Sequence, residues 1–219
     1  MNSNKLPGYL LAIGPILMMA MFIAVWPALV GTTEKEGLVG EALVKAVMET
    51  SMENFSITKI VATLTGAAMM ATMLGYTLWA RSLNRDGLKG ATLASIAAIT
   101  IPVATAGLMF SMDFNFAAGD AWQKGDIGNS LIIGAVAEYA SFGSTFIWVF
   151  VHIAVVFIGL ATVLQVSDKI SRGVGAILAI IGLIMFVMNF TTLDDSIIGM
   201  LWMLITVVSG INLIRQKTS

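Results

Sequence analysis

Long apolar segments alternate with short polar connections along the whole chain. Each segment has about 20 mostly apolar residues, the length that an α-helix needs to cross roughly 30 Å of hydrocarbon. The six segments are 9–30, 57–80, 91–111, 145–166, 173–190 and 197–213. None of them shows the alternation of polar and apolar residues that is typical of membrane β-strands. The pattern predicts an all-α integral membrane protein with six transmembrane helices in a bundle.

Two further segments, 38–52 and 127–142, have a helical pattern but are too short to span a bilayer. In the first, Glu41, Lys45 and Glu49 recur every four residues and oppose a face of apolar residues. The second is short and almost entirely apolar. We expect both to be amphipathic or short helices that lie roughly parallel to the membrane on its outer side.

The basic residues collect on every second connection between the predicted spans. One side has eight of the twelve Lys and Arg residues and only two acids, Asp86 and Asp168. These basic residues are Lys5, Arg81, Arg85, Lys89, Lys169, Arg172, Arg215 and Lys217. The other side has four basic residues and the remaining eleven of the thirteen acids. Because connections rich in Lys and Arg stay in the cytoplasm, we predict a plasma-membrane protein with both termini cytoplasmic.

The amino-acid composition narrows the class of protein further. The mean hydropathy is +0.90 and only 11% of the residues are charged, whereas a soluble domain has about 25% charged residues. We therefore expect a single transmembrane domain over residues 1–219. The sequence has no cysteine, which excludes disulfides and thiolate metal sites. No basic tract resembles a nucleic-acid-binding surface, so the expected contacts are the lipid bilayer and other membrane subunits or further copies of the chain.

His152, the only histidine, falls in the outer half of the fourth predicted span. An ionisable group within the membrane is a candidate functional residue by default. A single histidine cannot form a two-histidine metal or haem site, however. We therefore favour a structural role, in which a neutral His152 is hydrogen-bonded to Asp113 or to a hydroxyl of a neighbouring span.

Methionine offers a second candidate site, with Met109 and Met112 near Asp113 and His152. Thioether sulfurs favour Cu(I), so this set could form a soft copper site. The fifteen methionines are spread over the whole chain, however, as expected of flexible apolar side chains that fill irregular space. We expect no cofactor, and copper is the less favoured alternative.

Three acidic residues and the histidine could form an ion path: Glu138, Asp194, Asp195 and His152. Glu138 interrupts the apolar 127–142 segment, and a carboxylate buried there would indicate a bound cation or a proton relay. If that helix lies flat on the membrane, its carboxylate faces water, which is the reading we favour. Asp194 and Asp195 lie between the last two predicted spans and could instead cap the start of the sixth.

Three functions remain, and we rank them by how well the residues support each. A non-catalytic membrane subunit or scaffold comes first, because no G-x-S-x-G, H-E-x-x-H or Walker motif is present. A cation or proton-coupled transporter or channel that uses Glu138 and His152 comes second. A copper-dependent membrane enzyme, or its accessory subunit, comes third, so we do not expect the protein to be an enzyme.

The charge partition predicts a specific topology that reporter fusions can test. A fusion after Lys89 and a fusion after Lys124 should report opposite sides of the membrane, because the two positions lie on a basic and an acidic connection respectively. Each fusion is made with two reporters, one active only in the cytoplasm and one active only on the opposite side of the membrane, and the two activities are compared. The same sidedness for both fusions would contradict the topology.

Overall fold

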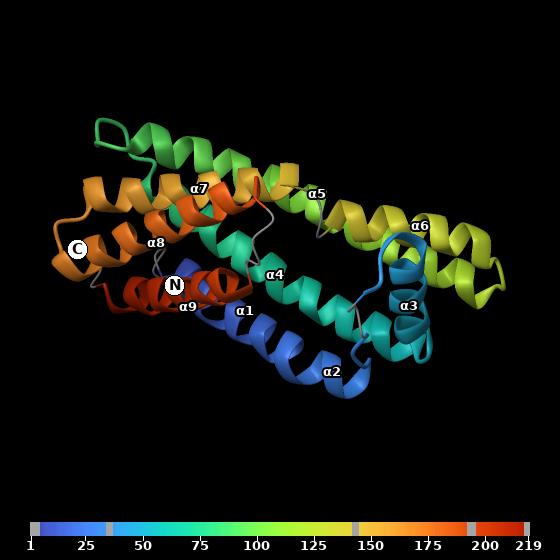
Figure 1. Ribbon diagram of the computed structural model, residues 1–219. Helices are drawn as coiled ribbons and strands as arrows, with labels where there is room; N and C mark the ends of the chain where they lie inside the picture. Colours follow the sequence, from blue (N-terminus) through green and yellow to red (C-terminus); the bar gives the residue numbers. More distant parts are fainter. Residues whose placement is uncertain (1–4, 34–36, 142–144, 192–195, 217–219) are drawn as a thin grey trace. The chain divides into compact units, whose positions relative to one another are not determined.

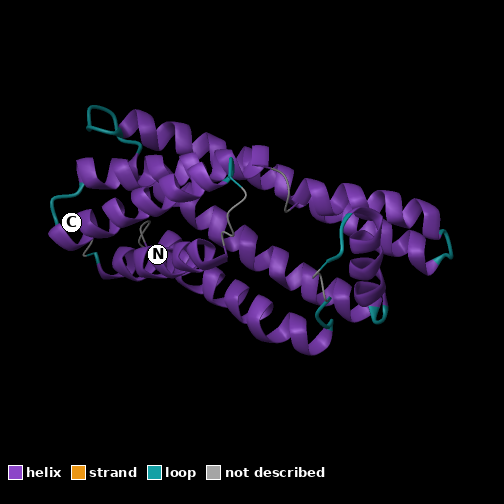
Figure 2. Ribbon diagram, viewed as in Figure 1, coloured by secondary structure: helices purple, strands orange, loops and turns teal. Residues whose placement is uncertain are grey.

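Helices make up 87% of the residues that the structure describes, and those residues contain no strand (Figure 2). The computed structural model describes residues 5–33, 37–141, 145–191 and 196–216. Its helices (Figure 1) are α1 Lys5–Ala20, a π-helix Met21–Val25, α2 Trp26–Leu29, α3 Gly40–Met52, α4 Phe55–Leu83, α5 Ala91–Gln123, α6 Ile127–Ser141, α7 Thr145–Gln165, α8 Lys169–Met188 and α9 Ser196–Arg215.

Six helical segments among the described residues are long and apolar enough to cross a membrane. They are Lys5–Leu29, Phe55–Leu83, Ala91–Gln123, Ile147–Gln165, Lys169–Met188 and Ile197–Arg215. The all-helical class and the six candidate spans are therefore confirmed, and together they suggest a multi-pass membrane protein. The segments expected as shorter helices form α3 and α6. Their orientation to a membrane stays a prediction.

The first candidate span contains a π-helix, Met21–Val25, which ends two residues before Pro27. Proline has no N–H and its ring clashes with the carbonyl four residues earlier. At this point the Trp26 N–H donates to the Met21 carbonyl, five residues back. The wider turn accommodates the ring, so the chain continues as one helix to Leu29.

Helix α5 is longer than the predicted span 91–111, because it continues to Gln123 and has 33 residues. At 1.5 Å per residue this is about 50 Å, well beyond the thickness of the hydrocarbon layer. Asp113 and Asp120 gave this stretch the character of a loop in the sequence. Phe114, Ala118 and Trp122 nevertheless recur every four residues, and Ala118 is fully buried. Packing of this apolar stripe extends the helix.

The chain forms two compact units, and unit 1 comprises Met1–Leu17, Ala68–Thr105 and Thr145–Ser219. Its helices approach closely at glycines. A Cβ atom on Gly175 of α8 would lie 2.9 Å from the carbonyl oxygen of Gly159 in α7. A Cβ atom on Gly210 of α9 would likewise lie 2.6 Å from the carbonyl oxygen of Gly8 in α1. Small residues allow such close helix contacts, which in lipid supply much of the packing energy.

Unit 2 comprises Met18–Ala67 and Ala106–Ser144, and its core lies between α3, α5 and α6. The buried stripe of α3 is Val44, Met48 and Met52, which cluster with Ala118 of α5. Helix α6 meets α3 at Gly134, where an added Cβ atom would lie 3.0 Å from Met48 Sδ. Thus α3 has the amphipathic character that its sequence predicted, with its apolar face buried against α5 and α6.

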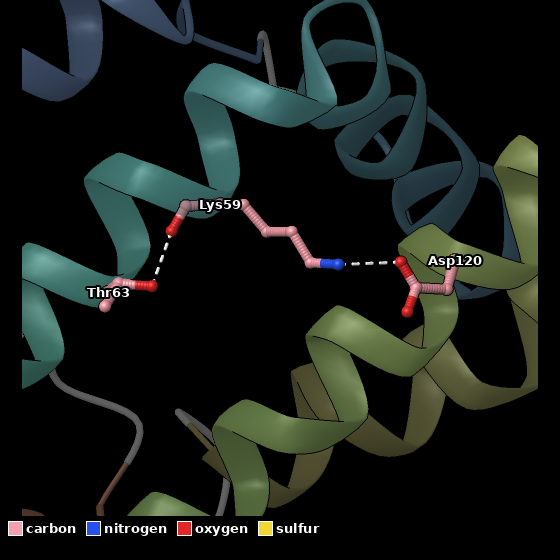
Figure 3. A network of polar contacts seen from close by, with 3 residues as sticks. All are labelled: Lys59, Thr63 and Asp120. Atoms are coloured by element: carbon pink, nitrogen blue, oxygen red, sulfur yellow. Dashed lines mark hydrogen bonds and ion pairs between the residues drawn. The ribbon is translucent and has the colours of Figure 1, made fainter.

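Lys59 links α4 to α5 within unit 2 (Figure 3). Its Nζ atom lies 2.8 Å from Asp120 Oδ1 and 5.0 Å from the centre of the Phe55 ring. Thr63 Oγ1 donates to the Lys59 carbonyl oxygen over 2.7 Å. The two charged side chains are 42% and 52% exposed, and an ion pair with that exposure contributes about 0–1 kcal/mol. The pair orients the two helices and contributes little to stability.

Two glycines of α8 form a matched pair for testing the close contact with α7. Gly175→Ala should lower the free energy of unfolding by about 1–3 kcal/mol, because the new methyl group would force the helices apart. Gly173→Ala should be neutral or slightly stabilising, since nothing lies within 4 Å of its added Cβ atom and alanine is the better helix former. Thermal unfolding in detergent would compare them, and equal melting temperatures would contradict the packing.

Candidate functional site

His152 lies in a cluster of aromatic rings within unit 1. Its side chain is 4% exposed. The imidazole stacks on Trp148, one turn earlier in α7, and meets Trp202 of α9 at 84°, with ring centroids 5.8 and 6.0 Å away. Trp202 stacks on Tyr76 of α4, which stacks on Trp79, each at 6.4 Å. We call these five residues the aromatic cluster.

The proton of His152 can be placed from its hydrogen bond to Asn189, the C-terminal cap residue of α8. Asn189 Nδ2 lies 2.8 Å from His152 Nδ1 and also 2.8 Å from the Met185 carbonyl oxygen. A carbonyl oxygen only accepts, so this amide atom is a nitrogen that donates to both groups. His152 Nδ1 is therefore an acceptor, and the neutral imidazole has its proton on Nε2.

Two N–H groups of the aromatic cluster are buried and have no acceptor among the described residues: His152 Nε2 and Trp202 Nε1. The Trp202 N–H lies near the Tyr76 hydroxyl but outside hydrogen-bond geometry, and that hydroxyl is bonded to Thr206 Oγ1 at 2.5 Å. An unpaired buried donor costs about 1–3 kcal/mol. The rings of His152 and Trp202 pack edge to face at 84°, which does not replace the missing hydrogen bonds.

The contact with Asn189 limits the chemistry of His152. A metal bound through Nδ1 would have to displace the Asn189 amide. A metal bound through Nε2 would move the proton to Nδ1, where it would oppose the amide N–H. A second proton on the ring would meet the same conflict. The geometry therefore stabilises a neutral imidazole with its proton on Nε2. The structural role that the sequence favours for His152 stays a prediction.

The prediction of which residue bonds to His152 was wrong. The sequence favoured Asp113 or a hydroxyl, whereas the structure shows the amide of Asn189. Asp113 is exposed on the part of α5 that belongs to unit 2. An amide suits this position better, because it can donate to His152 and to its own helix at the same time without placing a charge in an apolar interior.

The methionine candidates of the copper hypothesis take part in packing within unit 2. An added Cβ atom on Gly66 of α4 would lie 2.8 Å from Met112 Cε and 3.1 Å from its sulfur. Met112 thus fills the space that the absent side chain leaves. Met109 is half-buried on the same helix. Within the described residues, no group of three or more His, Cys, Asp and Glu side chains could hold a metal ion.

The proposed ion path can be followed only in part. Glu138 lies in the backbone of α6, but its side chain is outside the described residues, as are Asp194 and Asp195. His152 is the one member of this set whose side chain is placed. The structure therefore does not place these four side chains relative to one another, and the path stays a prediction.

Five buried Thr and Ser hydroxyl groups in unit 1 donate within their own helices. Each donates to the carbonyl oxygen four residues earlier, over 2.6 to 3.0 Å. The residues are Thr72, Thr77, Thr162, Thr206 and Ser209. These bonds satisfy the hydroxyl hydrogen locally, as is common for Ser and Thr in apolar helices. They leave little free polar capacity along the interior of the unit.

Unit 2 has an open groove that the sequence did not predict. It has a volume of about 490 Å³ and is lined by Glu49, Thr50, Met52, Glu53 and Trp122. Both carboxylates are exposed, so they are solvated without a ligand. None of the residues predicted for a metal site or an ion path lines this groove.

Sequence reasoning missed Asn189, Trp202 and Tyr76 as neighbours of His152. Asn189 had a usable signal, since it is a polar residue near the end of a predicted span. Trp202 and Tyr76 had none, because an aromatic residue within an apolar segment is equally typical of a lipid-facing position. No family model, curated protein or solved structure matches this chain.

The tautomer of His152 can be tested directly, because it is the only histidine. Nitrogen-15 NMR of histidine-labelled protein in detergent should show Nε2 protonated and Nδ1 unprotonated at neutral pH. Asn189→Leu removes the donor and should allow both tautomers to be populated. A proton on Nδ1 in the unmodified protein would contradict the assignment of the Asn189 amide.

Proposed function

We propose that the protein is a non-catalytic multi-pass membrane subunit or scaffold that packs against partner membrane proteins or lipids. The observation that carries this proposal is the internal closure of polar groups in unit 1. Five buried Thr and Ser hydroxyls donate to their own helices, and His152 is held neutral by Asn189. A catalytic or conducting site needs polar groups that are free to act on a substrate, and this interior offers few.

Close packing supports the same conclusion. Where Gly159 faces Gly175 and where Gly8 faces Gly210, backbone atoms occupy the positions that side chains would take. Helix contacts of this kind exclude water from the interfaces concerned. A solvated path through these interfaces would require the helices to separate.

The outward faces fit contact with lipid or with other membrane helices. Helix α8 buries one face and exposes an apolar one. Its exposed apolar residues are Ile170, Ile177, Ile180, Leu183, Ile184 and Val187. We place the protein in the plasma membrane with both termini in the cytoplasm, on the basis of the partition of Lys and Arg between the connections.

A cation or proton-coupled transporter or channel is the second candidate. It is favoured by one observation, the buried Nε2–H of His152 that no described acceptor satisfies. In this reading His152, Glu138, Asp194 and Asp195 contribute to the path. The fixed donor at Nδ1 speaks against it, because a second proton could enter the ring only at Nδ1, where it would displace the Asn189 amide.

Gentle detergent extraction from the native membrane, followed by native mass spectrometry and metal analysis, tests the proposal. We expect co-purifying membrane subunits or a defined assembly of several copies, and no stoichiometric metal. A bare monomer that catalyses ion flux in vesicles would overturn the proposal in favour of the transporter. Stoichiometric copper would favour the enzyme.

The variant His152→Gln sharpens this experiment. Glutamine can keep one hydrogen bond but neither titrates nor ligates well, so assembly should remain nearly intact if His152 is structural. Circular dichroism of the purified variant controls for folding. A folded and inserted variant that has lost all associated activity would show that His152 acts chemically.

A further inference from the structure

One end of unit 1 has a group of exposed basic residues without acidic partners. We call it the basic end and define it by Arg81, Arg85, Lys89, Lys169 and Arg172, all exposed. Among the described residues, ion pairs with carboxylates are formed by Lys45 and Lys59 but by none of these five. Their charges are thus free to interact with an external anion.

Two connections of the chain are joined at the basic end. Gln165 Nε2, at the end of α7, donates to the Leu83 carbonyl oxygen, at the end of α4, over 2.7 Å. Gly90 has a φ of +82°, and an added Cβ atom there would lie 3.1 Å from Ala161 Cα. The connection between α4 and α5 therefore packs against the end of α7, next to the connection that leads into α8. Arg85 and Lys89 come from the first connection, whereas Lys169 and Arg172 come from the start of α8.

The two connections also contain two acids, Asp86 and Asp168. Asp86 is exposed and forms no ion pair among the described residues, and Asp168 is held by the helix that follows it. Asp168 caps the start of α8, where its Oδ2 accepts from the backbone N–H and the hydroxyl of Ser171, each over 2.8 Å. These hydrogen bonds hold the pKa of the Asp168 carboxyl below its usual range, and the bond from the Ser171 backbone N–H has the larger effect. Ser171 is in turn fixed by Asn212 and Gln216 of the α9 region, over 3.0 and 3.1 Å. Asp168 is thus held within the cap and does not pair with Lys169 or Arg172.

Exposed apolar side chains lie directly beside the charges in the sequence. Leu88, next to Lys89, is 45% exposed, and Ile170, between Lys169 and Arg172, is 55% exposed. A soluble anion would contact only the charges. A molecule with an anionic head and an apolar tail would contact both kinds of side chain.

We propose that the basic end binds the headgroup of an anionic phospholipid. The phosphate contacts the Lys and Arg side chains of the two joined connections, and an acyl chain lies against Leu88 and Ile170. This inference rests on the proposed function, since it names the class of lipid that the membrane subunit contacts. Arg and Lys are suited to it, because arginine binds phosphate with two parallel hydrogen bonds and lysine as a point charge.

Lipid exchange followed by native mass spectrometry tests the site with purified protein in a neutral detergent. The probes are phosphatidylglycerol, phosphatidylcholine with the same acyl chains, and glycerol 3-phosphate as the soluble anion. We expect selective retention of phosphatidylglycerol, weaker at high salt because screening acts on exposed charges. Each neutralised basic residue should lower the affinity about fivefold, the usual contribution of one Lys or Arg near an anionic membrane surface.

The variant Lys89→Gln/Lys169→Gln removes two charges from the basic end, and Lys45→Gln/Lys124→Gln removes two elsewhere as a matched control. Loss of phosphatidylglycerol in the first variant alone would support the site. Equal retention of both lipids by the unmodified protein, or equal loss in both variants, would overturn it. Displacement of the lipid by an equal concentration of glycerol 3-phosphate would also overturn it, by showing a site for free anions.

If the double variant fails to fold, Lys89→Gln and Lys169→Gln are measured separately. These readouts do not depend on partner subunits, so the site can fail while the proposed function stands.

Discussion

Every polar group inside an apolar helix bundle has to find its partner within the protein, and unit 1 is organised around this constraint. Backbone groups are satisfied by the helices themselves. The buried hydroxyls add a second bond to the same helix, as Thr162 does with the Ile158 carbonyl. Only a few polar side chains remain to act between helices. His152 with Asn189 and Tyr76 with Thr206 are the pairs that do so in the aromatic cluster.

The same constraint explains how much of the fold could be predicted from the sequence. Span length and hydropathy depend on local composition, so all six long helices could be predicted. The end of α5 could not, because it depends on partners distant in the sequence. Asp113 and Asp120 indicated a loop, but Ala118 is fully buried in a cluster with α3, and Asp120 pairs with Lys59. Helix ends near charged residues are decided by such tertiary contacts rather than by propensity.

The sequence pointed to His152 as the central residue of the candidate site, but it did not identify the residues that contact it. His152 stood out because an ionisable residue in an apolar segment is costly unless it has a partner. Which partner it finds depends on the rotation and offset of α7 against α8. Those are set by steric contacts such as Gly159 against Gly175, and a single sequence contains no record of them. The preference for Asp113 followed from chemistry alone, and the packing of α8 brings Asn189 to that position instead.

The glycines and the single interhelical amide have different roles in the contact between α7 and α8. Glycine contacts provide a large, well-packed area, but the same small residues would permit several offsets of one helix along the other. A hydrogen bond between His152 and Asn189 has one geometry, and any other offset would leave Nδ1 without its donor. Buried polar pairs fix register in other helical assemblies in this way, at some cost in stability. This role needs a histidine that is neutral and shielded, which is the state that the Asn189 amide and the Trp148 ring impose on His152. A residue held in this state contributes to the specificity of packing, because only one offset of α7 along α8 keeps its hydrogen bond to Asn189.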